Sequence, residues 1–155
     1  MLAEDAALLD RFAKELSRKY TVHAELLPLS YIDSPETAEV YLLTANPHFN
    51  LLEVGYHREI PYYFEQRRRN LVFQSAFPFF FFDAKLGAPA GGDYWRAKLN
   101  PYLRHGLDAL VPKIMCVELF PCSSENFRAL PVDVPSQEFS FDLVWQAFAL
   151  GKCQW

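Results

Sequence analysis

The spacing of hydrophobic residues divides the chain into amphipathic helices and short apolar strands. A stripe of apolar residues at steps of four and three predicts a helix over residues 2–19: Leu2, Ala6, Leu9, Ala13, Leu16 and Tyr20. Val22, Ala24 and Leu26 then alternate with polar residues, which predicts a half-buried strand. The N-terminal quarter of the chain is therefore expected to be a helix followed by a strand.

Two continuous apolar runs, at residues 38–44 and 113–120, predict strands that are buried on both faces. Each run ends in a small polar turn, which is Thr44-Ala45-Asn46-Pro47 after the first and Pro121-Cys122-Ser123-Ser124 after the second. Ligands bind at the carboxyl ends of strands in open α/β sheets. These two turns are therefore the places where a site is expected.

A further helix is predicted from Pro61 to about Leu71, because proline suits the first turn of a helix. Its Phe64 and Leu71 would share one face. Three arginines in succession, Arg67 to Arg69, fan around such a helix and form no single patch. We expect them to be solvated.

The aromatic block 77–82 is expected to be a strand or an irregular wall of the core, and residues 87–92 a loop. Asp93 is the expected N-cap of a helix that carries Trp95 and Leu99 and is either kinked or ended before Pro101. A last helix opens at 135–137, with Gly151 as its C-terminal cap. Its Phe141, Val144, Trp145 and Phe148 share one face, which needs a strand or a partner to cover it.

Helices that alternate with buried strands predict an α/β fold with a largely parallel sheet, and 155 residues suit one domain over residues 1–155. We expect the strands at 39–44 and 113–120 to be adjacent and parallel, with helices near 2–19 and 139–150 beside them. Asn46 and the segment from Glu118 to Ser124 would then meet at one edge of the sheet.

Composition narrows the class of protein further. Hydrophobic residues make up 51% of the chain and aromatic residues 16%, which excludes intrinsic disorder. A net charge of −4 argues against strong nonspecific attraction to nucleic acid. No apolar run is long enough to span a bilayer, and acidic residues interrupt the N-terminal stripe, which is unlike a secretory signal.

Three cysteines, Cys116, Cys122 and Cys153, lack the even count of a disulfide framework. No Cys and His residues have the spacing of a zinc site. We therefore expect reduced thiols, a cytoplasmic location and no metal or other cofactor.

Candidate site residues follow from the two turns. Pro47 stiffens the turn that presents the Asn46 amide, which could hold a water or a ligand, and His48 could act there as an acid or an electrostatic stabiliser. Phe49 or Tyr56 could stack on a base, although core packing is the alternative for either ring. Glu118, the one carboxylate within its strand, could accept from an amine or could instead face solvent or an arginine. Cys122 and Ser123 complete the set of candidate substrate-binding residues.

Five segments in this order resemble uncharacterised bacterial members of the uracil-DNA glycosylase-like superfamily, over residues 38–155. They are the strand running into Asn46-Pro47, the Phe77-Pro78-Phe79 segment, Tyr94-Trp95, the V-E-L-F-P run at 117–121 and P-S-Q-E-F-S-F at 135–141. The resemblance implies a three-layer α/β/α sandwich with a mostly parallel sheet.

The resemblance also implies a function and site roles. Asn46 would orient the water that attacks the sugar carbon, and Glu118 falls where the family reads the base edge. Ala45 and His48 differ from the family's G-x-N-P-G motif, and the chain stops where a second motif with His or Asn would follow. We therefore expect a DNA-repair hydrolase that binds or excises a nucleobase of DNA, in a form truncated at its C-terminus. The alternative is a catalytically inactive domain of the same fold that binds a protein partner or a second copy.

Overall fold

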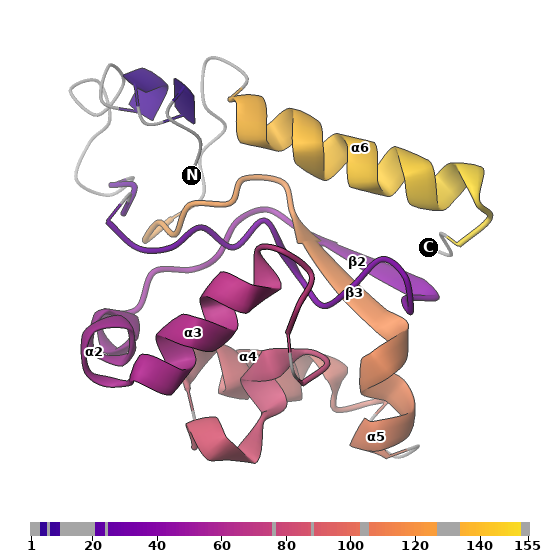
Figure 1. Cartoon of the computed structure of the whole chain (residues 1–155), viewed down its shortest axis with the longest axis horizontal. Helices are drawn as coiled ribbons and strands as arrows, with labels where there is room; N and C mark the ends of the chain where they lie inside the picture. Colours follow the sequence, from indigo (N-terminus) through magenta and orange to yellow (C-terminus); the bar gives the residue numbers. More distant parts are fainter. Residues whose placement is uncertain are drawn as a thin grey trace.

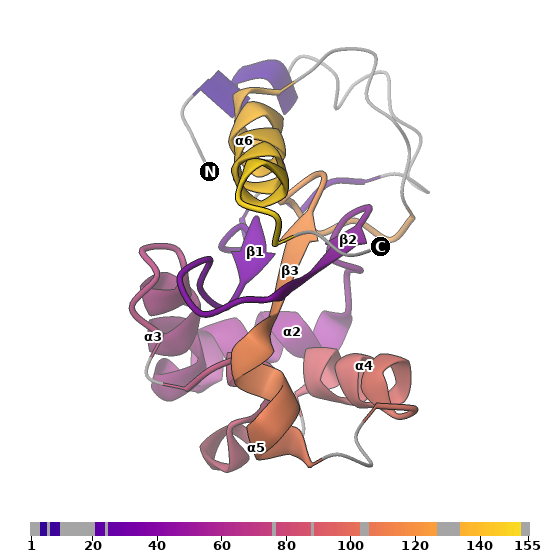
Figure 2. The same ribbon diagram turned by 90° about the vertical axis from the view of Figure 1, so that its right-hand side faces the viewer.

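The computed structural model describes residues 4–5, 7–9, 21–23, 25–75, 77–87, 89–102, 106–126 and 134–152. The fold is mixed α/β, with a small sheet of three strands and helices on both sides of it (Figures 1 and 2). The strands are β1 (Tyr31–Ile32), β2 (Val40–Thr44) and β3 (Ile114–Glu118). The α-helices are α2 (Leu51–Glu59), α3 (Pro61–Asn70), α4 (Ala90–Leu99), α5 (Leu107–Leu110) and α6 (Pro135–Ala149). Short 3-10 helices cover Phe80–Phe82, Ala84–Leu86 and Val111–Lys113.

The sheet has the order β1-β3-β2, with β3 in the middle. β2 pairs parallel to β3 from Val40 opposite Ile114 to Thr44 opposite Glu118, which confirms the predicted adjacent parallel strands. β1 pairs antiparallel to β3, with Tyr31 opposite Val117. The described sheet is therefore mixed, and its one parallel pair places the carboxyl ends of β2 and β3 side by side.

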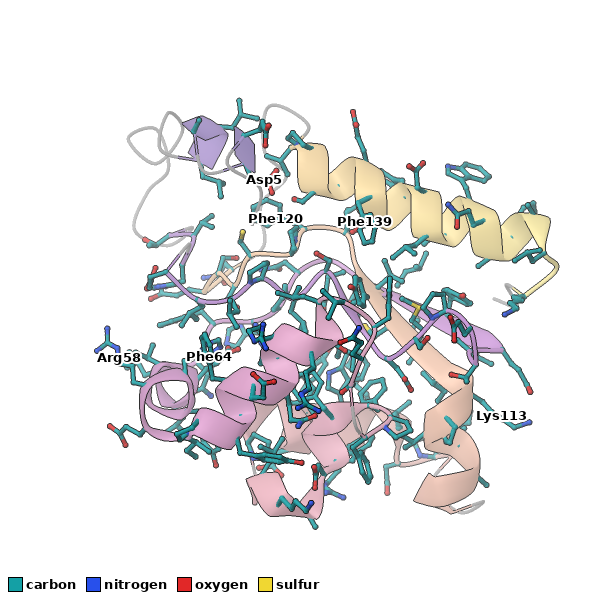
Figure 3. All side chains as sticks on the ribbon, viewed as in Figure 1. Asp5, Arg58, Phe64, Lys113, Phe120 and Phe139 are labelled. Carbon is teal, nitrogen blue, oxygen red and sulfur yellow. The ribbon has the colours of Figure 1, made fainter. Side chains whose placement is uncertain are left out.

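Alternate residues of β3 serve two hydrophobic cores. Ile114 and Cys116 pack with the aromatic segment 79–82, while Met115 and Val117 pack with Leu143 and Ala147 of α6. In Figure 2, α6 lies on one side of the sheet, and α2, α3 and α4 lie on the other. Phe139 extends from α6 toward the sheet (Figure 3), where its ring lies 5.9 Å from that of Tyr31. Glu118 follows Ile114 and Cys116 in the alternation along β3, so its side chain faces the same side of the sheet as theirs, the side of α2, α3 and α4.

β2 is less buried than its apolar run predicts. Only Tyr41 is fully buried, and Leu43 is 46% exposed. The reason is its position at the edge of the described sheet, where one flank lacks a covering strand. The expected strand at 22–26 is wrong for the described part of that segment, which holds a single bridge between Val22 and Ser124.

The polar residues of α3 face inward, contrary to the predicted solvated arginines. Tyr63, Gln66, Arg67 and Asn70 are buried, whereas Phe64 is 40% exposed and Leu71 is half-buried. Arg68 and Arg69 do lie at the surface, where both pair with Glu65. The inner face is polar because its side chains have polar partners in the core, such as the Asn70 amide, which donates to the Tyr31 carbonyl at 2.6 Å.

The aromatic segment and α4 also differ in detail from expectation. Phe79 to Phe82 form a buried wall that includes a 3-10 turn, which agrees with the irregular alternative. α4 begins at Ala90, inside the predicted loop, because Gly91 and Gly92 let its first turn approach the Phe81 ring and carbonyl closely. Pro89 is the N-cap, and Asp93 lies within the first turn instead of capping it. The predicted end of this helix before Pro101 is confirmed.

The predicted last helix is present as α6, and Gly151 follows it with φ +69°. Its buried residues are Ser136, Ser140, Leu143 and Ala147. The predicted aromatic face is largely exposed, with Trp145 65% and Phe148 56% accessible. Residues 4–5 and 7–9 are helical, and the rest of the helix predicted at 2–19 lies outside the described residues, as does the segment 127–133.

Candidate functional site

Backbone hydrogen bonds continue beyond the parallel strands and tie the two polar turns together. The amide of Leu119 donates to the Thr44 carbonyl at 2.8 Å, and the amide of Phe120 donates to the Ala45 carbonyl at 3.0 Å. The Ser124 amide donates to Pro47 at 3.1 Å. Each turn therefore holds the other in place, and the side chains that leave them are preorganised.

Asn46 is fixed at the end of β2 by this connection. Its amide nitrogen donates to the Ser124 hydroxyl at 2.7 Å and to the Pro47 carbonyl at 3.1 Å. The Ser124 hydroxyl in turn donates to the Asn126 carbonyl at 2.9 Å, which sets the direction of the whole chain of bonds. The Asn46 amide group has a defined orientation, and its carbonyl oxygen remains an acceptor.

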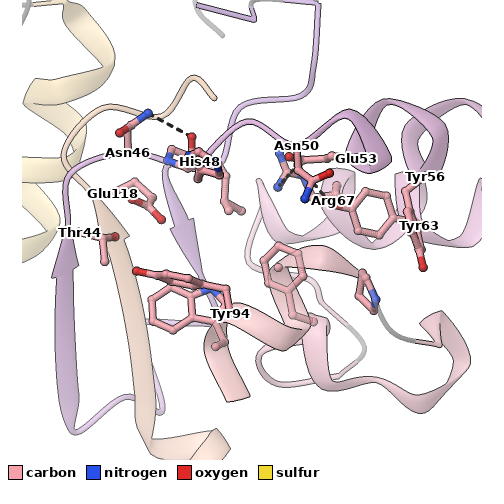
Figure 4. Close-up of a pocket in the computed structure, with 16 residues that line it drawn as sticks. Thr44, Asn46, His48, Asn50, Glu53, Tyr56, Tyr63, Arg67, Tyr94 and Glu118 are labelled. Atoms are coloured by element: carbon pink, nitrogen blue, oxygen red, sulfur yellow. Dashed lines mark hydrogen bonds and ion pairs between the residues drawn. The ribbon is translucent and has the colours of Figure 1, made fainter. Parts of the chain in front are cut away.

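The turn lies at a cavity of about 390 Å³ on the α2–α4 side of the sheet (Figure 4). Its polar lining residues come from β2, β3, α2 and α3 and the loop after β2: Thr44, Asn46, His48, Asn50, Glu53, Arg67 and Glu118. Its aromatic lining residues are Tyr56, Tyr63, Phe81, Tyr94 and Trp95. A cavity of this size, with aromatic walls and a few convergent polar groups, suits a small planar ligand.

Glu118 is the most unusual group of the cavity, because its carboxyl is 3% exposed and incompletely paired. Among the described residues, no hydrogen-bond partner reaches its Oε2 atom, and Oε1 lies 4.0 Å from the Cys116 sulfur. Burial raises the pKa of Glu118 to about 7, although a hydrogen bond from Thr44 and the charge of Arg67 act in the opposite direction. In Figure 4, Glu118 extends toward the Tyr94 ring, whose own pKa is raised by burial and by Glu118.

A second polar group, at the far end of the cavity, is centred on Glu53. Its Oε1 atom lies 3.4 Å from Arg67 Nη1 and 3.7 Å from His57 Nε2, and the Tyr63 hydroxyl donates to it at 3.3 Å. Burial opposes ionisation, but His57, Arg67 and Tyr63 together hold the pKa of Glu53 below its usual value. Arg67, 1% exposed, also donates to the Leu27 carbonyl. This end therefore carries a buried and mutually neutralising ion pair.

Of the candidates from the sequence, Asn46, His48 and Glu118 come together at the cavity, with aromatic rings as one wall. The structure does not bring Phe49, Cys122 and Ser123 into its lining. Phe49 instead stacks on His23, with ring centroids 3.4 Å apart, and the Ser123 carbonyl accepts from the His23 amide. Burial raises the pKa of Cys122 to about 12, which opposes an activated thiolate there.

Sequence reasoning missed Glu53, Arg67 and the α4 aromatic residues as parts of the cavity. Two spacings were available as signals. Glu53 and His57 lie four residues apart on one helix, and Tyr63 and Arg67 do so on the next. Glu65 can pair with both Arg68 and Arg69 at such spacings, which leaves Arg67 as the arginine with a separate role.

Within the described ranges, no three His, Cys, Asp or Glu residues cluster as metal ligands would. No helix of the described part of the chain is long and apolar enough to cross a membrane. Comparisons of the chain with protein-family models, with curated proteins and with solved structures found no match.

Proposed function

We propose that this chain is a uracil-DNA glycosylase-like protein that binds a nucleobase of DNA in the cavity and hydrolyses its glycosidic bond. One observation carries the proposal. Asn46 and Glu118, from neighbouring parallel strand ends, line the same cavity as a set of aromatic rings. A flipped base needs rings against which to stack, a polar group that reads its edge, and a placed water near the sugar.

Each of these requirements has a candidate in the cavity. Tyr94 and Trp95 offer ring surfaces, and the buried Glu118 carboxyl offers an edge contact. The Asn46 carbonyl oxygen can accept a hydrogen bond from a water. That water attacks the sugar carbon and gives up a proton to solvent, while the glycosidic bond breaks and its electron pair leaves with the base. His48, exposed on the loop after Asn46, can donate to the departing base.

The proposal also includes the three-layer fold of this class of proteins. A three-layer α/β/α arrangement is supported by α6 on one side of the sheet and α2, α3 and α4 on the other (Figure 2). The parallel pairing of β2 with β3 also supports it, while β1 adds an antiparallel strand.

The test is release of the base from short labelled single-stranded DNAs that contain uracil, hypoxanthine, cytosine, guanine or adenine at one position. The wild type should release at least one of these bases, and Asn46→Ala should lower the rate by about 100-fold or more. Asn100→Ala, at the exposed end of α4, is the matched control and should leave the rate unchanged. Equal rates for wild type and Asn46→Ala, or no release by the wild type, would refute hydrolysis in this cavity.

A second candidate function is an interaction domain that binds another copy of the chain. The observation in its favour is an apolar groove between α6 and β2, formed in part by the exposed Leu43, Trp145 and Phe148. Sedimentation velocity over a range of protein concentrations tests it. Association that weakens in Trp145→Ser would support this function, and a monomer at every concentration would refute it.

A further inference from the structure

The cavity has two buried polar ends of opposite hydrogen-bonding character, and each end has atoms without a hydrogen-bond partner among the described residues. Glu118 Oε2 is an acceptor without a donor. Arg67 Nε and Nη1 are donors without an acceptor, although Nη1 lies 3.4 Å from Glu53. Native proteins seldom leave such buried groups unsatisfied, so unpartnered atoms on residues that line a cavity point to a ligand that pairs with them.

The two ends lie apart within the cavity. Figure 4 shows Glu118 with Thr44 and Tyr94 at one side, and Arg67 with Asn50 and Glu53 at the other. The aromatic residues of α3 and α4 lie on the walls, so a flat ring could contact both ends with opposite edges. A ligand that satisfies both ends needs a donor on one edge and an acceptor on the other.

Charge decides which acceptor suits Arg67. Glu53 lies next to the guanidinium and, because its pKa is held low, stays anionic at neutral pH. A phosphate or carboxylate at this end would meet Glu53 as well as Arg67, and like charges at close range repel. A neutral carbonyl oxygen accepts from the Arg67 nitrogens that lack a hydrogen bond, Nε and Nη1, without this cost.

We infer, on the basis of the proposed function, that the cavity selects bases that have both an exocyclic amine and a ring carbonyl. The amine would donate to Glu118, and the carbonyl would accept from Arg67. Cytosine and guanine have both groups on separate positions of one ring. Adenine has the amine but offers only ring nitrogens as acceptors, and uracil has carbonyls but offers only a ring N–H as a donor. Each rejected base therefore lacks either the carbonyl for Arg67 or the exocyclic amine for Glu118.

The experiment measures equilibrium binding of the four deoxynucleosides deoxycytidine, deoxyguanosine, deoxyadenosine and deoxyuridine by calorimetry at pH 8. This pH lies above the value of about 7 to which burial raises the pKa of Glu118, so its carboxylate form prevails. Deoxycytidine or deoxyguanosine should bind about 10-fold more tightly than either of the other two, because each of the others lacks one of the two exocyclic contacts. Comparable binding of all four, tighter binding of deoxyadenosine or deoxyuridine, or no binding at all would overturn the inference.

Glu118→Gln supplies a gain of binding that misfolding cannot imitate. An amide N–H₂ at this position donates to a carbonyl, so the variant should bind deoxyuridine more tightly than deoxycytidine. An unchanged order of affinities would contradict the assignment of Glu118. Glu39→Gln, at an exposed ion pair with Lys113 on the outer end of β2, is the matched control and should keep the wild-type order.

Binding and base release separate the inference from the function on which it rests. Tight binding of deoxycytidine without release from DNA would uphold the ligand class and refute hydrolysis. Release of uracil and cytosine at equal rates would uphold hydrolysis and refute the ligand class.

Discussion

Replacing Glu118 with Gln should make the protein more stable above neutral pH and change its stability little near pH 4.5. The wild-type carboxyl is 3% exposed, and burial raises its pKa from 4.5 to about 7. The folded protein therefore holds this proton more tightly than the unfolded chain does. Its contribution to stability is complete below pH 4.5 and is lost as pH rises through about 7.

The size of the effect follows from the shift. A rise from 4.5 to about 7 corresponds to about 3 kcal/mol of unfolding free energy. Glutamine resembles the protonated carboxyl and cannot ionise, so it escapes this loss. Above pH 8 the variant should exceed the wild type by about 3 kcal/mol, and the gap should close toward pH 4.5.

Urea unfolding of both proteins at several pH values between 4.5 and 8.5 measures this gap. Burial also raises the pKa of Asp33 to about 6, which gives the wild type a second contribution of the same sign. Because Asp33 is present in both proteins, its effect cancels in the difference at each pH. A gap that stays constant across the range, or that widens toward acid, would refute the reasoning.

Two further substitutions test the packing around the cavity. Asn70→Ala should lower the unfolding free energy by about 2–4 kcal/mol in urea titrations, because it leaves two backbone groups near β1 without their partners; a loss too small to measure would contradict this account. Gly91→Ala should cost about 1–3 kcal/mol, since its Cβ would lie 2.4 Å from the Phe81 ring, and thermal unfolding should show the loss. Gly55→Ala, in an open position of α2, is the control and should raise stability by about 0.5–1 kcal/mol, and equal behaviour of the two variants would be the contrary result.

The strands and helices that follow from the spacing of apolar residues were predictable from the sequence. Val40 to Leu43 and the run at 114–118 have the composition of paired strands, and Pro61 and Gly151 mark helix ends through their backbone preferences. Parallel pairing follows from the helices between the two strands. From these facts the meeting of Asn46 and Glu118 could be foreseen.

The far end of the cavity could not be predicted in this way. Pattern reasoning assumes that arginines face water, because an unpaired buried charge is costly. Arg67 escapes this rule through Glu53 and the Leu27 carbonyl, and both partners lie on other segments of the chain. The exposed aromatic face of α6 was also not predictable. The spacing of apolar residues identifies such a face but does not show what covers it.

The polar inner face of α3 has a consequence for how one native structure is selected. A rotation of this helix by about 100° would bury Phe64 but withdraw Tyr63 from the hydrophobic core, so the two changes in apolar burial largely offset each other. The same rotation would separate Arg67 and Asn70 from their hydrogen-bond partners. Each group left without a partner would lower the free energy of unfolding by about 1–3 kcal/mol. The correct rotation of α3 is therefore specified by the hydrogen bonds of Arg67 and Asn70 and not by hydrophobic burial. Redesign that replaced this face with leucines would raise hydrophobicity, remove the penalty for misrotation and erase one end of the cavity.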